Sequence, residues 1–224
     1  MSQLTDSSKQ NAAKAALQFL DNLPDDVIIG IGTGSTTNAF IHLLKDYRGK
    51  IGGAVATSSG TKAELQKVGI PCVELNSVTE LPIYIDGADE VDPHFNLIKG
   101  GGGALTQEKL VAHVAKKFIC IVDEKKVVDC LGSFPLPIEV LPMARSLVAR
   151  ELVKLGGTPK YREHFTTDNG NIILDVSGLK IAEPLKLEQA INQIPGVICN
   201  GIFALNRAHV LVIGNADSAD IKTR

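Results

Sequence analysis

Short apolar runs and longer amphipathic stretches alternate along the first half of the chain. The runs are rich in β-branched residues and end in glycine, serine, threonine or aspartate, which is typical of strands at 27–31, 54–57, 83–85 and 118–122. Apolar residues at helical spacing between them predict helices at 9–20, 36–47, 61–68 and 106–116. Strands that are apolar on both faces and separated by helices indicate βαβ units on a parallel sheet, and therefore an α/β fold.

The pattern changes after residue 131. The segment "GSFPLPIEVLPMARS" carries Pro135, Pro137 and Pro142, which makes it too proline-dense for a central strand or a helix interior. We therefore expect an extended hinge or edge strand that leads into a second unit. Beyond it the pattern predicts helices at 146–155 and 187–194 and strands at 172–176 and 208–213.

The composition narrows the classes of function. The chain has 224 residues, 44% of them hydrophobic, and a formal net charge of −2, so it offers no broad basic field for nucleic acid. No apolar segment approaches the roughly 18–20 residues that span a bilayer. The four cysteines form no CxxC pair, which is typical of free thiols in a reducing compartment. We therefore predict a cytoplasmic protein that binds neither nucleic acid nor membrane.

The first predicted strand runs into the glycine-rich stretch "GIGTGSTT", residues 30–37. A dinucleotide fingerprint needs a third glycine where Ser35 stands and an acidic residue after the next strand, and a P-loop needs a lysine; all are missing. What remains is a tight turn whose N–H groups and hydroxyls, those of Thr33, Ser35 and Thr36, face an anion. The alternative is a glycine turn with a Ser/Thr helix cap and no ligand.

Two later stretches gather further polar groups. "YIDGADE" places Asp86 and Asp89 at a strand end, where a solvated turn is the simpler explanation. "IKGGGGALTQEK" combines Lys99, the run Gly100–Gly103 and Glu108. Such a run is either a flexible linker or a backbone that aims N–H groups at developing negative charge. The five histidines are solitary, so we predict no metal site, and the set suits proton transfer on a phosphorylated metabolite.

These stretches, together with "ICIVDEKK", "FPLPIEVLPMAR" and "TDNGNIILDV" in that order, closely resemble the A-type ribose-5-phosphate isomerases. The resemblance covers nearly the whole chain. It implies interconversion of ribose 5-phosphate and ribulose 5-phosphate in the pentose phosphate pathway, without metal or cofactor. It also implies a Rossmann-like α/β domain over 1–131 and 204–224, a smaller inserted α+β domain over 132–203, and a homodimer or homotetramer.

The resemblance also implies roles for individual residues. Glu108 corresponds to the catalytic base, which moves a proton from C2 to C1 through an enediolate. Asp86 assists ring opening or moves the hydroxyl proton, and Lys99 with the glycine amides stabilises the enediolate. The substrate-binding positions implied are Thr33, Gly34, Ser35, Thr36, Asp86, Gly87, Ala88, Asp89, Lys99, Gly100, Gly101, Gly102 and Lys126, with Lys125 as the neighbouring alternative to Lys126. Gly103 stands where some members have alanine, which we expect to loosen the loop.

Two other classes of function were weighed against the isomerase. A sugar-phosphate sensor would carry a DNA-binding helix-turn-helix or a basic face, and neither is evident in the sequence. A nicotinamide oxidoreductase is disfavoured by Ser35 and by the missing acidic residue.

Overall fold

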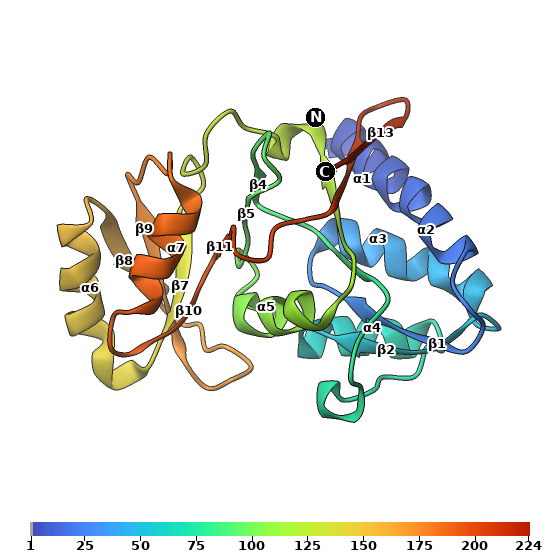
Figure 1. Ribbon diagram of the computed structural model, residues 1–224, viewed down its shortest axis with the longest axis horizontal. Helices are drawn as coiled ribbons and strands as arrows, with labels where there is room; N and C mark the ends of the chain where they lie inside the picture. Colours follow the sequence, from blue (N-terminus) through green and yellow to red (C-terminus); the bar gives the residue numbers. More distant parts are fainter. Residues whose placement is uncertain (1) are drawn as a thin grey trace. The chain divides into compact units, whose positions relative to one another are not determined.

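The computed structural model describes the backbone of residues 2–224 and the side chains of residues 7–224. The chain divides into two compact units (Figure 1). Unit 1 comprises the described residues up to 87 together with 110–126 and 208–224, and unit 2 comprises 88–109 and 127–207. The chain therefore leaves unit 1 twice and returns to it twice.

A six-stranded sheet forms the centre of unit 1, in the order β13-β12-β6-β3-β1-β2. Its strands are β1 (Val27–Ile31), β2 (Ile51–Ala56), β3 (Tyr84–Asp86), β6 (Phe118–Asp123), β12 (Val210–Gly214) and β13 (Ala219–Thr223). Neighbouring strands are parallel except β12 and β13, which pair antiparallel at the edge. The predicted α/β fold is confirmed. The loops after β1, β3 and β6 leave the same edge of the sheet, because parallel strands share their direction.

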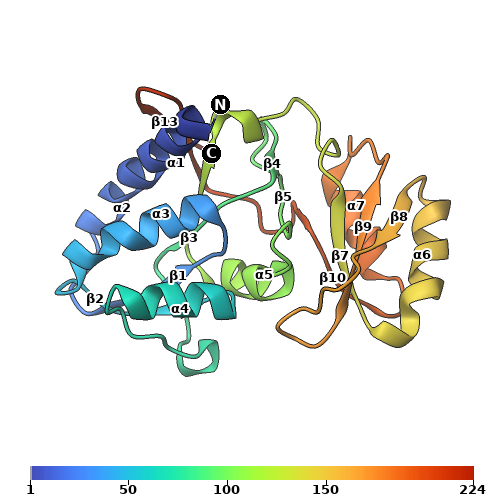
Figure 2. The same cartoon turned by 180° about the vertical axis from the view of Figure 1, so that it is seen from behind.

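Helices flank this sheet. They are α1 (Ser2–Ala16), α2 (Gln18–Asp21), α3 (Ser35–Leu43), η1 (Leu44–Tyr47), α4 (Ser59–Lys67), η2 (Leu75–Ser77) and η3 (Glu124–Lys126). The helices α1 and α3 run side by side in both views (Figures 1 and 2). The predicted helix 9–20 is interrupted after Ala16, and it starts earlier than its apolar pattern indicates.

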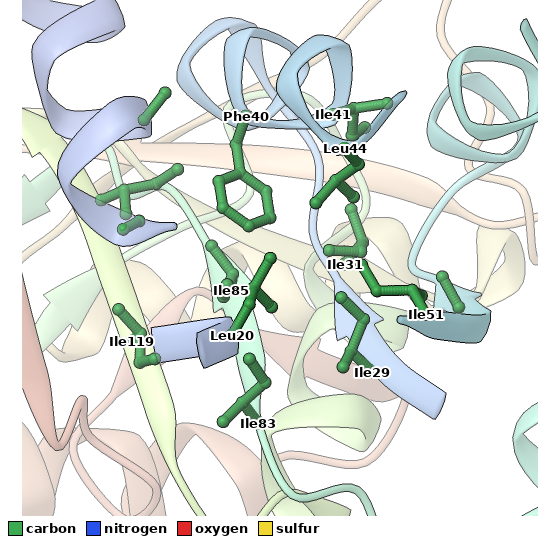
Figure 3. Packing of buried hydrophobic residues seen from close by; sticks show 14 of the residues in the cluster. Leu20, Ile29, Ile31, Phe40, Ile41, Leu44, Ile51, Ile83, Ile85 and Ile119 are labelled. Carbon is green, nitrogen blue, oxygen red and sulfur yellow. The ribbon is translucent and has the colours of Figure 1, made fainter. Parts of the chain in front are cut away.

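The core of unit 1 explains why β1 reads as a continuous apolar run. Ile29 and Ile31 lie in one buried cluster with Phe40 and other side chains of α3 (Figure 3). Gly30 faces the other way, where an added Cβ would lie 2.6 Å from Cγ1 of Val111 in α5 (Leu105–Val114). Both faces of the strand are therefore covered. Each fully buried Ile or Phe stabilises the fold by about 1.5–3 kcal/mol relative to an exposed one.

Unit 2 contains two antiparallel sheets. One has four strands in the order β10-β7-β9-β8, namely β7 (Leu136–Val140), β8 (Thr158–Tyr161), β9 (Ile172–Ser177) and β10 (Val197–Asn200). The other has three short strands in the order β11-β5-β4, namely β4 (Glu90–Val91), β5 (Leu97–Ile98) and β11 (Ile202–Phe203). The helices are η4 (Pro142–Ala144), α6 (Arg145–Lys154) and α7 (Pro184–Asn192). Val148 and Leu152 of α6 and Ile191 of α7 share a buried cluster with Leu136, Ile138 and Val140.

The proline-rich segment is a central strand, so the prediction of a hinge or edge was wrong. β7 pairs with β9 on one side and with β10 on the other. Proline is tolerated there because Pro137 lies just beyond the residues of β7 that pair with β10, which are Ile138–Val140. Its carbonyl still accepts a hydrogen bond from the backbone N–H of Gly201 at 2.8 Å. The missing N–H therefore removes no bond from the ladder.

The segment 88–109 belongs to unit 2, whereas the predicted larger domain includes it. Leu97 and Ile98 pair with Phe203 and Ile202. The N–H of Lys99 continues this pairing and donates to the carbonyl of Gly201 at 2.9 Å. These contacts join residues about a hundred positions apart. The predicted domains, 1–131 with 204–224 and 132–203, stay a prediction.

Candidate functional site

In unit 1, the buried carboxylate of Asp86 organises the loop that follows β1. Its Oδ1 accepts hydrogen bonds from the N–H of Thr33 at 2.9 Å, the N–H of Gly87 at 2.7 Å and the hydroxyl of Thr37 at 3.3 Å. Its Oδ2 accepts a short bond from the hydroxyl of Tyr84. These four donors are neutral groups from the ends of β1 and β3 and from α3.

Gly32 is a glycine because the same carboxylate occupies the space beside it. An added Cβ at Gly32 would lie 1.7 Å from Cγ of Asp86, a distance that no side chain can accommodate. The sequence motif therefore reflects a close approach between the first loop and the acidic turn. Thr33, Asp86 and Gly87, three of the predicted site residues, are brought together by this contact.

Hydroxyl groups from two neighbouring loops meet at Thr33. Its Oγ1 lies 2.9 Å from Oγ1 of Thr57, 2.9 Å from Oγ of Ser58 and 3.1 Å from Oγ1 of Thr61. Thr61 also donates to the carbonyl of Gly32 at 2.7 Å. We call Thr33, Thr57, Ser58 and Thr61 the hydroxyl cluster. It holds the loops after β1 and β2 together.

The two loops begin their helices differently. Ser58 caps α4 by accepting a bond from the N–H of Thr61 at 3.0 Å. Gly34 precedes α3 with a φ of 133° and provides no side-chain cap. The Ser/Thr helix cap that the alternative assumed for the first loop is therefore absent there. At the start of α3, Ser35 is exposed and Thr36 is buried.

The two predicted lysines of unit 1 are neighbours on η3. Lys126 ends η3 and is half-buried, whereas Lys125 is exposed. η3 follows β6, which pairs in parallel with β3, so Lys126 leaves the sheet at the same edge as Asp86. This position is the one in which an α/β sheet binds ligands.

In unit 2, Lys99 and Glu108 form a buried ion pair. Nζ of Lys99 lies 3.3 Å from Oε1 of Glu108, and the two side chains are 2% and 4% exposed. Lys99 also lies 5.6 Å from the centre of the Phe203 ring, and Nζ of Lys109 lies 4.6 Å from the same centre. A buried carboxylate next to a buried ammonium has its charge compensated where water cannot do so.

The glycine run lies against Asp89. The N–H of Gly101 donates to Oδ2 of Asp89 at 2.8 Å, and an added Cβ at Gly101 would lie 2.7 Å from Oδ1. Gly100 and Gly103 have φ angles of 100° and 81°, and the N–H of Gly103 donates to the carbonyl of Gly100 at 2.9 Å. An added Cβ at Gly103 would also lie 2.1 Å from Cζ of Phe165. The run is thus an ordered turn, and Gly103 closes it rather than loosening it.

Residues that the sequence interpretation missed hold the first turns of α5, which carries Glu108. Thr106 donates a short bond to the buried carboxylate of Glu139, which also accepts from Thr167 at 2.8 Å. Nζ of Lys109 lies 2.6 Å from Oε1 of the buried Glu188. Glu139 could have been noticed as an acidic residue in an otherwise apolar strand. Glu188 lies in a helix with ordinary charge spacing and gave no such signal.

Neither a group of metal ligands nor a membrane-spanning helix occurs among the described residues. Among the side chains that the structure describes, no three histidine, cysteine, aspartate or glutamate residues are grouped so that they could hold a metal ion. Within residues 2–224, no helix combines the length and apolar character needed to cross a membrane.

Comparisons with known proteins give one consistent result. The sequence model of the family described as Ribose 5-phosphate isomerase A (phosphoriboisomerase A) matches residues 53–218. The structure of ribose 5-phosphate isomerase A from Neisseria gonorrhoeae is similar, with 48% identity, a TM-score of 0.93 and coverage of 98% of this chain and 97% of that chain. A D-ribose-5-phosphate isomerase in complex with phospho-erythronic acid has 41% identity, a TM-score of 0.92 and coverage of 98% and 99%. The isomerase from Methanocaldococcus jannaschii has 37% identity, a TM-score of 0.88 and coverage of 96% and 98%.

Proposed function

Because the chain belongs to the ribose 5-phosphate isomerase A family, an enzyme family that interconverts ribose 5-phosphate and ribulose 5-phosphate, we propose that Glu108 is the base of this reaction. This family assignment replaces the sensor and oxidoreductase alternatives. The observation that carries the proposal is the buried Lys99–Glu108 pair, with 3.3 Å between Nζ and Oε1. A carboxylate in this setting exchanges a proton with carbon while the adjacent ammonium compensates the negative charge that remains.

The reaction divides into two proton movements. Glu108 removes the proton on C2 of the open-chain aldose, which leaves an enediolate, and returns it to C1. The hydroxyl proton moves from O2 to O1, so that the carbonyl group ends on C2. Lys99 and the N–H groups of the run Gly100–Gly102 stabilise the negative charge on the enediolate oxygens.

The two aspartates have different tasks in this proposal. Asp86 accepts hydrogen bonds from Thr33, Thr37, Gly87 and Tyr84, which hold its carboxylate in place. Asp86 therefore orients the loop and assists ring opening from there. Asp89 is half-buried and accepts from Gly101, so it is the better placed aspartate for moving the hydroxyl proton. Comparing Asp86→Asn with Asp89→Asn tests this division: the second is expected to keep its stability and lose turnover.

The other predicted site residues bind the substrate. The residues Thr33–Thr36 at the start of α3, together with Gly87, Ala88 and Lys126, bind the sugar phosphate, and the positive end of the helix favours its charge. The enzyme uses neither metal nor organic cofactor, acts in the pentose phosphate pathway of the cytoplasm, and assembles as a homodimer or homotetramer. Light scattering on the purified protein distinguishes the two assemblies.

A direct assay tests the catalytic proposal. Pure protein is incubated with ribose 5-phosphate and a chelator in D2O, and ribulose 5-phosphate is followed with its deuterium content at C1. We expect turnover in the wild type and a loss of about 10²–10⁴-fold in kcat for Glu108→Gln. The matched control is Glu163→Gln, because Glu163 is an exposed glutamate of unit 2.

Three outcomes would contradict the proposal. Glu108→Gln at the parent rate would remove Glu108 from its role, because that substitution deletes the base and little of the shape. Loss of wild-type product on chelation would contradict the metal-free reaction. Product without any deuterium at C1 in D2O, in the wild type and in an equally active Glu108→Gln alike, would indicate a direct hydride shift instead of proton transfer through a base.

A further inference from the structure

Arg162 contacts the glycine run from a distant part of the sequence. It follows β8, and its N–H donates to the carbonyl of Ile173 in β9 at 3.0 Å, which extends the β8–β9 pairing. Its side chain is 18% exposed. Arg162 therefore projects from a rigid sheet, and its position does not depend on a loop.

The guanidinium group makes two sets of contacts. Its Nε lies 2.8 Å from Oδ2 of Asp175 and its Nη2 lies 2.5 Å from Oδ1, so the carboxylate holds it by two parallel bonds. Nη1 donates to the carbonyl oxygen of Gly101 at 3.1 Å, and longer contacts of 3.4 Å reach the carbonyl of Gly100. Arg162 thus links a carboxylate in β9 to two successive peptide groups of the glycine run.

Those two peptide groups carry the N–H groups of Gly101 and Gly102. The carbonyl of Gly100 shares its peptide group with the N–H of Gly101, and the carbonyl of Gly101 shares its own with the N–H of Gly102. Along the described chain all peptide bonds are trans, so each N–H points away from its carbonyl. A cation on the carbonyl side therefore fixes the direction of both N–H groups, and it also polarises them toward a negative charge.

Two observations show that this orientation is held in the structure. The N–H of Gly101 points at Oδ2 of Asp89, at 2.8 Å, on the side away from Arg162. The ring of Phe165 lies 5.2 Å from Cζ of Arg162 and also fills the space beside Gly103. Four consecutive glycines have no side chains to restrict them, so an external group must supply the order.

We propose that Arg162, held by Asp175, is a positioning residue that sets the direction of the Gly101 N–H group toward Asp89 and of the Gly102 N–H group toward the enediolate. The proposal rests on the proposed function, in which these amides stabilise the enediolate. Arg162 touches no reacting atom and acts through the backbone. Because the enediolate carries its charge only during the reaction, the effect falls on kcat more than on KM.

The test compares Arg162→Met with Arg150→Met, because Arg150 is an exposed arginine of the same unit. We expect Arg162→Met to lower kcat by about 10- to 100-fold, with KM changed by about twofold or less. Amide hydrogen exchange in the peptide 98–105 should be at least about tenfold faster than in the wild type. Arg150→Met should leave both measurements unchanged.

Two further variants separate positioning from a general loss of stability. Asp175→Asn keeps Arg162 but removes its ionic anchor, and Arg162→Lys keeps the charge but lacks the planar fork. Both should give kcat values between those of the wild type and Arg162→Met, measured per folded enzyme with thermal unfolding as the check. If Arg162→Met does not fold, Asp175→Asn and Arg162→Lys carry the test through the same two measurements.

The proposal is overturned if the variants turn over at the wild-type rate per folded enzyme, or if the exchange of 98–105 stays unchanged. A failure of the proposed function is recognised separately. Full activity of Glu108→Gln would show that Glu108 is not the base. The exchange measurement on Arg162→Met would still report whether Arg162 orders the glycine run.

Discussion

Each unit buries a carboxylate, Asp86 in unit 1 and Glu108 in unit 2, and the two are held in different ways. Asp86 in unit 1 accepts hydrogen bonds from backbone N–H groups and hydroxyls, all of them neutral. Glu108 in unit 2 lies 3.3 Å from the ammonium of Lys99. Neutral donors fix the carboxylate of Asp86 in place, whereas the ammonium of Lys99 compensates the charge of Glu108. In the proposed function, this difference separates the organising role of Asp86 from the reacting role of Glu108.

In both units a glycine lies directly beside the carboxylate of an aspartate. Gly32 makes room for Asp86, and Gly101 makes room for Asp89; added Cβ atoms would lie 1.7 Å and 2.7 Å from those carboxyl groups. In unit 1 the N–H of Thr33, the residue after Gly32, donates to Asp86. In unit 2 the N–H of Gly101 itself donates to Asp89. The glycine-rich motifs are therefore needed for a close approach of backbone and carboxylate.

The largest effect is expected from breaking the ion pair of unit 2. Lys99→Met leaves the buried Glu108 without this cation, which should lower the free energy of unfolding by about 3–5 kcal/mol. The double variant Lys99→Met/Glu108→Gln should recover part of that loss, because it removes both charges. Urea titration measures both, with Lys160→Met as the exposed control. Strictly additive effects would show that the two side chains do not interact.

A smaller effect is expected from the carboxylate of unit 1. Asp86→Asn places an amide nitrogen among groups that donate hydrogen bonds, and so leaves at least one buried donor unsatisfied. We expect a loss of about 1–3 kcal/mol in the free energy of unfolding. Asp25→Asn is the control, because Asp25 is exposed in the same unit. If Asp86→Asn lost as much stability as Lys99→Met, the contrast between the two carboxylates would disappear.

A still smaller loss in the free energy of unfolding is expected from a substitution in the hydroxyl cluster. Thr33→Val keeps the shape of the side chain but removes the hydroxyl that meets Thr57, Ser58 and Thr61. The expected loss is about 0.5–1.5 kcal/mol for each net hydrogen bond. Thr33→Ser keeps the hydroxyl and should stay closer to the wild type in the same urea titration. Equal stability of Thr33→Val and the wild type would mean that the cluster does not join the two loops.

The smallest effect is the contribution of His209, in unit 1, to the pH dependence of the unfolding free energy. Burial, together with the charges of Arg224 and Lys117, holds the pKa of His209 below its ordinary value of 6.5. Neutral Nδ1 accepts a bond from the N–H of Phe118 at 3.0 Å. The unfolded chain therefore binds more protons, and this contribution to stability is present above pH 6.5 and is lost as the pH falls through the folded pKa.

Removing His209 should flatten this part of the pH dependence. In the plot of unfolding free energy against pH, His209→Gln is expected to have a shallower slope than the wild type. The difference corresponds to a fraction of one bound proton. His94→Gln serves as the control, since His94 is exposed. The same slope in wild type and His209→Gln would contradict the lowered pKa.

Local patterns predicted much of the larger sheet. The expected strand 27–31 coincides with β1, because its apolar residues pack on both faces. The glycines of the first loop and the aspartates of the acidic turn were also recognisable, since glycine and aspartate at strand ends are local features. Pro137 was misjudged because its tolerance depends on where the neighbouring strand β10 ends, about sixty residues further on.

The sequence by itself determined the α/β class and the positions of the glycines, carboxylates and lysine, because periodicity and motif are properties of neighbouring residues. Only the tertiary structure decided what surrounds each carboxylate, and that Arg162 reaches the carbonyls of Gly100 and Gly101. The physical reason is that charge compensation and hydrogen bonding act across a few ångströms in space, between residues that lie tens of positions apart in the chain.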